Sequence, residues 1–122
     1  MVEGSKIDKA THSNNQDKAM SEAMLFDNAV KAALEFAEKD GNTLVIVTAD
    51  HETGGLSLAS ATRSKGSKQP AQWATTNHTA IHVPIYAYGP GAMEFTGMLD
   101  NTDICKKLSV MLQLKDFPKI EN

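Results

Sequence analysis

The sequence predicts an α/β fold in which a sheet is flanked by helices. An amphipathic helical pattern over residues 19–39 leads directly into an apolar, β-branched segment, residues 43–48, which is the order found in half of a crossover unit. A second apolar strand is expected over residues 83–88, where a Gly-Pro-Gly sequence closes it. A last helix is expected after Asn101.

Length and composition limit the class of protein. With 122 residues, 41% hydrophobic and 22% charged, the chain fits a single domain over residues 1–122. A net charge of −3 gives no indication of a nucleic-acid partner, and no run is long enough to cross a bilayer. The single cysteine excludes an internal disulfide. Met1 and Val2 resemble the end of a buried strand, so we expect a fragment of a larger protein.

The helix over residues 19–39 is predicted by the spacing of its apolar residues, and Gly41 can end it in the left-handed conformation. Its expected core-facing stripe consists of Phe26, Ala29, Val30, Ala33, Leu34 and Ala37.

The next segments are predicted from their apolar patterns and turn signals. Residues 43–48 are apolar on both faces, which is typical of a central parallel strand. Residues 56–59 alternate and predict a short strand, whereas residues 61–76 are polar and predict a flexible surface loop. In the last helix, Cys105 is expected to be a small buried apolar residue.

Three groups of residues carry metal-ligand chemistry. Residues 3–16 are polar and contain loop signals, and Asp8 and His12, four residues apart, would share one face if this segment formed a helical turn. Asp50 and His51 directly follow the apolar strand, and ligands in α/β proteins gather at the carboxyl ends of strands. His78 stands in a polar stretch. Taken singly, these residues have ordinary alternatives, namely a solvated surface pair, a strand-to-loop transition and a loop histidine.

Taken together and in order, the groups are more specific. They comprise Val2-Glu3-Gly4-Ser5-Lys6-Ile7-Asp8 with His12, then Thr48-Ala49-Asp50-His51, then His78-Thr79 before Tyr88-Gly89-Pro90-Gly91-Ala92. Over essentially its whole length the chain resembles the C-terminal third of an alkaline phosphatase. The resemblance implies part of a three-layer α/β/α fold, a phosphate monoester substrate, two zinc ions, one magnesium ion, and a dimeric parent enzyme that is periplasmic or secreted.

The resemblance also implies a role for each ligand. Asp8, His12 and His78 match the ligands of the first zinc. Asp50 and His51 match ligands of the second zinc, and Glu3 matches a ligand of the magnesium ion. Two imidazoles and one carboxylate leave an open zinc position, as catalytic zinc requires, and a carboxylate suits magnesium.

The chain departs from the family pattern by what it lacks. None of its serines follows an aspartate, so the nucleophile motif of the Asp-Ser-Ala type is absent, and the only arginine, Arg63, stands in the predicted loop. We therefore expect the chain to be inactive alone, to need the missing N-terminal portion as its partner, and to self-associate through unpaired strand edges. The alternatives are a stand-alone zinc-binding module and a fragment of a related metal-dependent phosphomutase.

Overall fold

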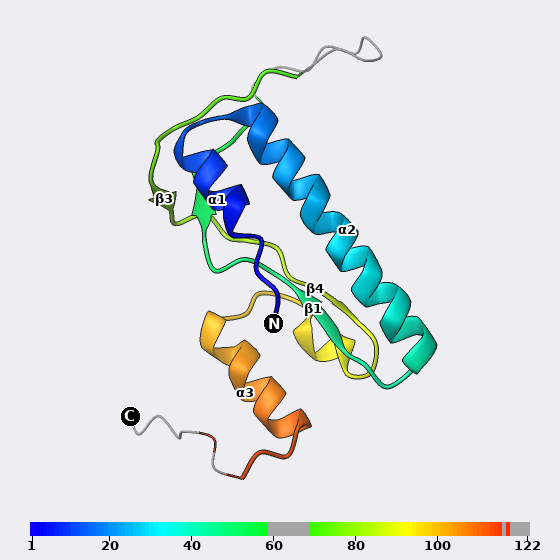
Figure 1. Ribbon diagram of the computed structural model, residues 1–122. Coiled ribbons are helices and arrows are strands. Elements are labelled where there is room, and N and C mark those ends of the chain that lie inside the picture. The colour runs from blue at the N-terminus through cyan, green and yellow to red at the C-terminus, as the bar shows by residue number, and fades with distance from the viewer. Residues whose placement is uncertain (59–68, 116, 118–122) are drawn as a thin grey trace. The chain divides into compact units, whose positions relative to one another are not determined.

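The computed structural model describes residues 1–58, 69–115 and 117, and it divides the chain into two compact units. The first unit consists of Met1–Ala32 and Ala49–Pro84, and the second consists of Ala33–Thr48 and the residues from Ile85 onward. The long helix α2, Gln16–Asp40, contributes to both units (Figure 1). Residues 61–68 of the predicted loop, including Arg63, lie outside the described residues.

The first unit contains helix α1, Ser5–His12, the first part of α2, and the strands β2, Glu52–Thr53, and β3, His78–Thr79. The two strands pair antiparallel. The chain turns sharply after β2 at Gly54, whose φ of +95° is a left-handed conformation that favours glycine. A Cβ atom at Gly54 would also lie 2.6 Å from the ring of Trp73, so only glycine fits this approach.

The second unit contains the end of α2, the strands β1, Val45–Val47, and β4, Tyr86–Tyr88, the 3₁₀ helix η1, Ala92–Phe95, and helix α3, Asn101–Met111. Among the described residues of this unit, Ala37 and Phe95 are the buried hydrophobic ones. At the start of α3, the Asp100 carboxylate accepts hydrogen bonds from the first turn while Asp103 accepts from the Asp100 backbone N–H, which completes a capping box.

The two predicted helices are confirmed, but the prediction that residues 43–48 form a parallel strand is wrong. Helix α2 begins earlier than predicted because the Asn15 side chain accepts a hydrogen bond from the Lys18 backbone N–H and caps it. β1 is not a parallel strand, since it pairs antiparallel with β4. Parallel pairing needs a long crossover, usually a helix, and the described residues between β1 and β4 form no helix. An apolar run alone cannot reveal the direction of its partner.

Other elements are shorter or more exposed than predicted. Residues 56–59 form no strand in their described part, where only Ser57 makes an isolated bridge, to Gln72, and Ala59 lies outside the described residues. Cys105 is exposed, so the prediction of a buried cysteine was wrong. Within the helix stripe, Ala37 is buried and Phe26, Val30 and Leu34 are half-buried, whereas Ala29 and Ala33 are exposed.

The hydrophobic core of the described residues is small. Its buried apolar members are Ala10, Ala19, Ala37 and Phe95, while many larger apolar side chains remain accessible to solvent. Within the described part of the chain, no helix combines the length and apolar character that a membrane span requires. The elements that position the candidate ligands, α1, β2 and β3, all belong to the first unit.

Candidate metal centre

Helix α1 and strand β3 bring three candidate ligands together. Asp8 and His12 lie one helical turn apart on α1, as the sequence predicts, and His78 opens β3. Asp8 Oδ1 lies 3.3 Å from His12 Nε2 and 3.5 Å from His78 Nε2, and the two histidine nitrogens are 3.1 Å apart. The three residues therefore present one ligand atom each to a common point.

The spacing of these atoms fits tetrahedral zinc. Zinc holds nitrogen and carboxylate oxygen at roughly 2.0–2.1 Å, and in a tetrahedron of that size neighbouring ligand atoms are about 3.3 Å apart. Each of the three measured separations lies close to that value. Two imidazoles and one carboxylate would leave a fourth position, and the side chain of His78 is 49% exposed, so the group is open to solvent.

A backbone carbonyl sets the orientation and tautomer of His12. Its Nδ1 lies 2.6 Å from the carbonyl oxygen of Thr76. Because a carbonyl oxygen can only accept, Nδ1 carries the proton and Nε2 keeps the lone pair that a metal needs. Metal-ligating histidines commonly donate their other ring N–H to such an acceptor, so this contact matches a ligand role.

Asp50 and His51 form a second ligand pair next to the first group. Asp50 Oδ2 lies 3.5 Å from His51 Nε2, again close to the separation expected between two ligands of one tetrahedral metal ion. The His51 ring stacks on that of His78, with centroids 3.5 Å apart. The Asp50 side chain is 89% exposed, so this candidate pair lies at the surface beside the first group, and further ligands of any second ion would have to come from elsewhere.

The hydroxyl of Thr53 connects the two groups. It donates a hydrogen bond of 2.6 Å to Asp8 Oδ1 and lies 3.2 Å from His51 Nδ1, from which it accepts. This arrangement leaves His51 Nε2 as the nitrogen with a free lone pair. The hydrogen bond from Thr53 is the main cause that lowers the pKa of Asp8. Burial opposes this shift, and the nearby histidines favour the ionised carboxylate.

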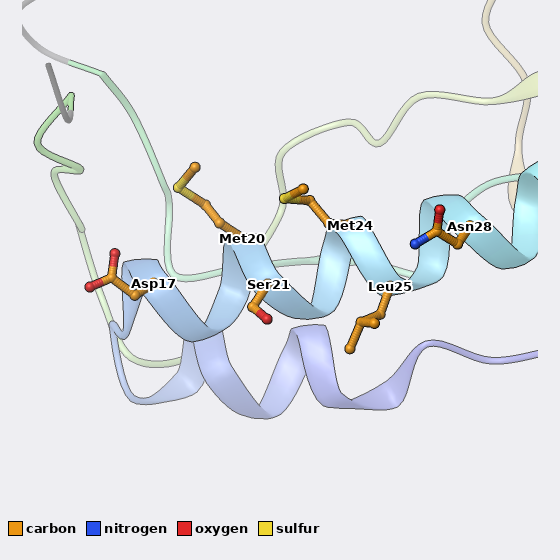
Figure 2. Close-up of a pocket in the computed structure, with 6 residues that line it drawn as sticks. All are labelled: Asp17, Met20, Ser21, Met24, Leu25 and Asn28. Carbon is orange, nitrogen blue, oxygen red and sulfur yellow. The ribbon is translucent and has the colours of Figure 1, made fainter. Parts of the chain in front are cut away.

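The structure does not bring Glu3 into this cluster. Glu3 is exposed, and among the described residues it makes no hydrogen bond or ion pair. The pocket shown in Figure 2 is also separate from the ligands. It runs along α2 and is lined by Asp17, Met20, Ser21, Met24, Leu25 and Asn28.

Sequence reasoning missed three groups that support the ligands: the Thr53 hydroxyl, the Glu52 carboxylate and the carbonyl of Thr76. In the sequence, Glu52 and Thr53 simply follow the Asp50 and His51 pair, and no pattern there indicates a supporting role for them. Their roles depend on the pairing of β2 with β3, which brings Thr53 opposite His78 and Glu52 opposite Thr79. No local pattern in the sequence identifies that register.

The fold and the ligand cluster define an α/β chain with a candidate metal centre, and comparison with known proteins supplies its family. The family model described as alkaline phosphatase matches residues 1–71 and 59–114. The chain belongs to the alkaline phosphatase family.

Individual relatives agree with this assignment. The chain is 34% identical to Alkaline phosphatase 4 of Bacillus subtilis, over 84% of this chain and 37% of the relative. It is 37% identical to the alkaline phosphatase of Escherichia coli K12, over 93% of this chain and 27% of the relative. The chain thus spans about a third of the length of the curated relatives it matches.

A solved structure confirms the predicted partial α/β fold. A mutant of the TAB5 alkaline phosphatase, with magnesium bound in its M3 site, superposes with a TM-score of 0.81 and 44% identity. The match covers 90% of this chain and 34% of that protein. The alignment with the Bacillus subtilis relative extends over 169 residues, more than the 122 of this chain, so that relative contains residues without a counterpart here.

Replacing Thr53 with valine is expected to raise the pKa of Asp8 in metal-free protein. Valine keeps the shape of threonine but removes the hydroxyl that donates to the carboxylate. Because the folded-state pKa of Asp8 is depressed, the stability this carboxylate contributes is present above its unfolded pKa and is lost as the pH falls through the folded pKa. The variant should therefore lose that contribution at a higher pH.

An NMR titration of the Asp8 carboxyl carbon measures this shift. Thr75→Val, at another threonine of the first unit, serves as the control. An unchanged Asp8 titration in Thr53→Val would show that the hydroxyl does not govern the carboxylate.

Proposed function

We propose that this chain is the metal-binding part of an alkaline phosphatase, a phosphomonoester hydrolase, and that its metal is zinc. The observation that carries the proposal is the near-tetrahedral spacing of the ligand atoms of Asp8, His12 and His78. Membership of the alkaline phosphatase family supports the reaction class.

The residues of the chain have distinct parts in this proposal. Asp8, His12 and His78 hold the first zinc, and Asp50 with His51 provides two ligands of the second. When bound, a pair of zinc ions stabilises the entering and leaving oxygens of a phosphoryl transfer. Thr53 keeps the Asp8 carboxylate ionised and fixes the tautomer of His51.

Magnesium and the partners of the chain belong to the same proposal. Glu3 is proposed as a magnesium ligand because of its place in the family pattern and because the TAB5 relative binds magnesium. Phosphate monoesters are the proposed substrates of the intact enzyme. The proposed partner is the part of the enzyme that supplies the serine nucleophile and the phosphate-binding arginine. A periplasmic or secreted location of the intact enzyme stays a prediction of the resemblance.

Titration of zinc into metal-free chain tests the proposal. We expect one tightly bound zinc per chain, because among the described residues only the first site brings three candidate ligands together. Binding should raise the melting temperature, since a ligand that binds only the folded state stabilises it. Isothermal titration calorimetry and thermal unfolding on the same samples give both quantities. Absence of specific zinc binding would contradict a preformed site.

A second candidate function is a zinc-binding module without catalysis. It is favoured by the fact that the complete three-ligand group lies within one compact unit of the chain. Both functions predict zinc binding and no appreciable hydrolysis by the isolated chain, so they differ in whether the bound metal serves hydrolysis once the missing part of the enzyme is present. A phosphomutase fragment is not proposed, because the family model that matches is that of alkaline phosphatases.

A further inference from the structure

The ribbon formed by β2 and β3 has two chemically different faces. Thr53 pairs with His78 and Glu52 pairs with Thr79. Because successive side chains of a strand point to opposite faces, Thr53 and His78 share one face and Glu52 and Thr79 share the other. The first face is the metal face, since Thr53 and His78 both contact Asp8 Oδ1.

On the opposite face, the Glu52 carboxylate joins three parts of the chain. It accepts hydrogen bonds from the Thr79 hydroxyl, from the Gly55 backbone N–H at 3.0 Å and from the Leu56 backbone N–H at 3.3 Å. Partial burial alone would raise the pKa of Glu52. The hydrogen bonds from Thr79, Gly55 and Leu56 outweigh burial, so the pKa of this carboxyl is lowered and it stays ionised.

The proposed catalytic chemistry gives this carboxylate no direct part, although it follows directly after His51. Its contacts fix the turn after β2 and the side chain next to His78. The ribbon itself contains only two residue pairs, so its own backbone pairing specifies the register weakly. A slip of one residue would move His78 to the face away from Asp8 and His12.

We propose that Glu52 and Thr79 are positioning residues that fix the register of β2 against β3 and thereby hold His78 in the zinc site. This inference rests on the proposed zinc-binding function. The Glu52–Thr79 pair acts through His78 and does not touch the metal. Replacing a group that hydrogen-bonds directly to a metal-ligating side chain typically changes metal affinity by about 10–100-fold, and we expect an effect of that order when the register that holds His78 is loosened.

The test compares zinc affinity in matched variants of the full 122-residue chain. Thr79→Val removes the hydroxyl and keeps a β-branched side chain, and we expect zinc to bind about 10–100-fold more weakly. Glu52→Gln should weaken binding in the same direction. Thr79→Ser retains the hydroxyl and should retain the affinity. Glu38→Gln removes the same charge from an exposed residue of α2 and should change nothing.

Two further readouts separate positioning from folding. The visible spectrum of bound cobalt, used in place of zinc, reports ligand geometry and should change in Thr79→Val but not in Thr79→Ser. Far-UV circular dichroism and thermal unfolding of the metal-free variants report the fold and should match the unmodified chain. A weaker affinity accompanied by an unfolded metal-free Thr79→Val, with Glu52→Gln folded and binding normally, would overturn the positioning role.

The zinc affinities of the unmodified chain and of the variants also separate the positioning role of Glu52 and Thr79 from the proposed zinc-binding function. If the unmodified chain binds zinc and both Thr79→Val and Glu52→Gln bind it equally well, the inference is wrong and the proposed function stands. If the unmodified chain binds no zinc, the proposed function fails and the inference fails with it.

Discussion

Replacing His78 with alanine is expected to weaken zinc binding by more than about 100-fold, because losing a direct ligand costs more than losing a partner behind one. His78 Nε2 lies 3.1 Å from His12 Nε2 and 3.5 Å from Asp8 Oδ1, so its removal leaves two ligands where three converged. The two remaining ligands, Asp8 and His12, come from the same turn of α1, so they can coordinate an ion from one side only. Calorimetric titration of zinc measures the change.

His82 supplies the control for this substitution. It is an exposed histidine of the same compact unit and belongs to neither ligand group. His82→Ala removes an equal imidazole and should leave the affinity and the stoichiometry unchanged. Equal zinc binding by His78→Ala and the unmodified chain would show that the metal sits elsewhere. Equal weakening in both variants would indicate nonspecific binding by histidines.

The parts of the site that follow from local spacing could be predicted from the sequence. Asp8 and His12 are four residues apart, and α1 does place them on one face. The long amphipathic pattern predicted α2 because its apolar period extends over many residues. The last helix was expected after Asn101, and α3 begins at Asn101 with Asp100 as its N-cap, one residue before the predicted capping segment.

The parts that depend on contacts between distant segments could not be predicted. Thr53 reaches Asp8, 45 positions earlier in the chain, and the carbonyl of Thr76 reaches His12 from 64 positions away. Strands β2 and β3 contain two residues each, too few to show an alternating pattern. The direction of β1 was also beyond local reasoning, because half-buried apolar strands occur in both parallel and antiparallel pairs.

The 122-residue chain, loaded with zinc and magnesium, is expected to hydrolyse phosphate monoesters at least about 10⁴-fold more slowly than an intact alkaline phosphatase. Its candidate ligands are in place, but none of its serines follows an aspartate as the family nucleophile does. Nucleophile, phosphate clamp and metal ligands act as a unit, so the loss of one removes most of the benefit of the others. Release of p-nitrophenol from p-nitrophenyl phosphate measures the rate.

The alkaline phosphatase of Escherichia coli, a 37% identical relative, is the positive control in the same buffer and metals. His78→Ala is the control for traces of a contaminating phosphatase, since a contaminant would be unaffected by that substitution. Hydrolysis by the chain that approaches the control enzyme and disappears in His78→Ala would contradict this prediction. It would require a nucleophile other than the family serine, such as a water molecule, for which Asp8, His12 and His78 would hold the activating metal.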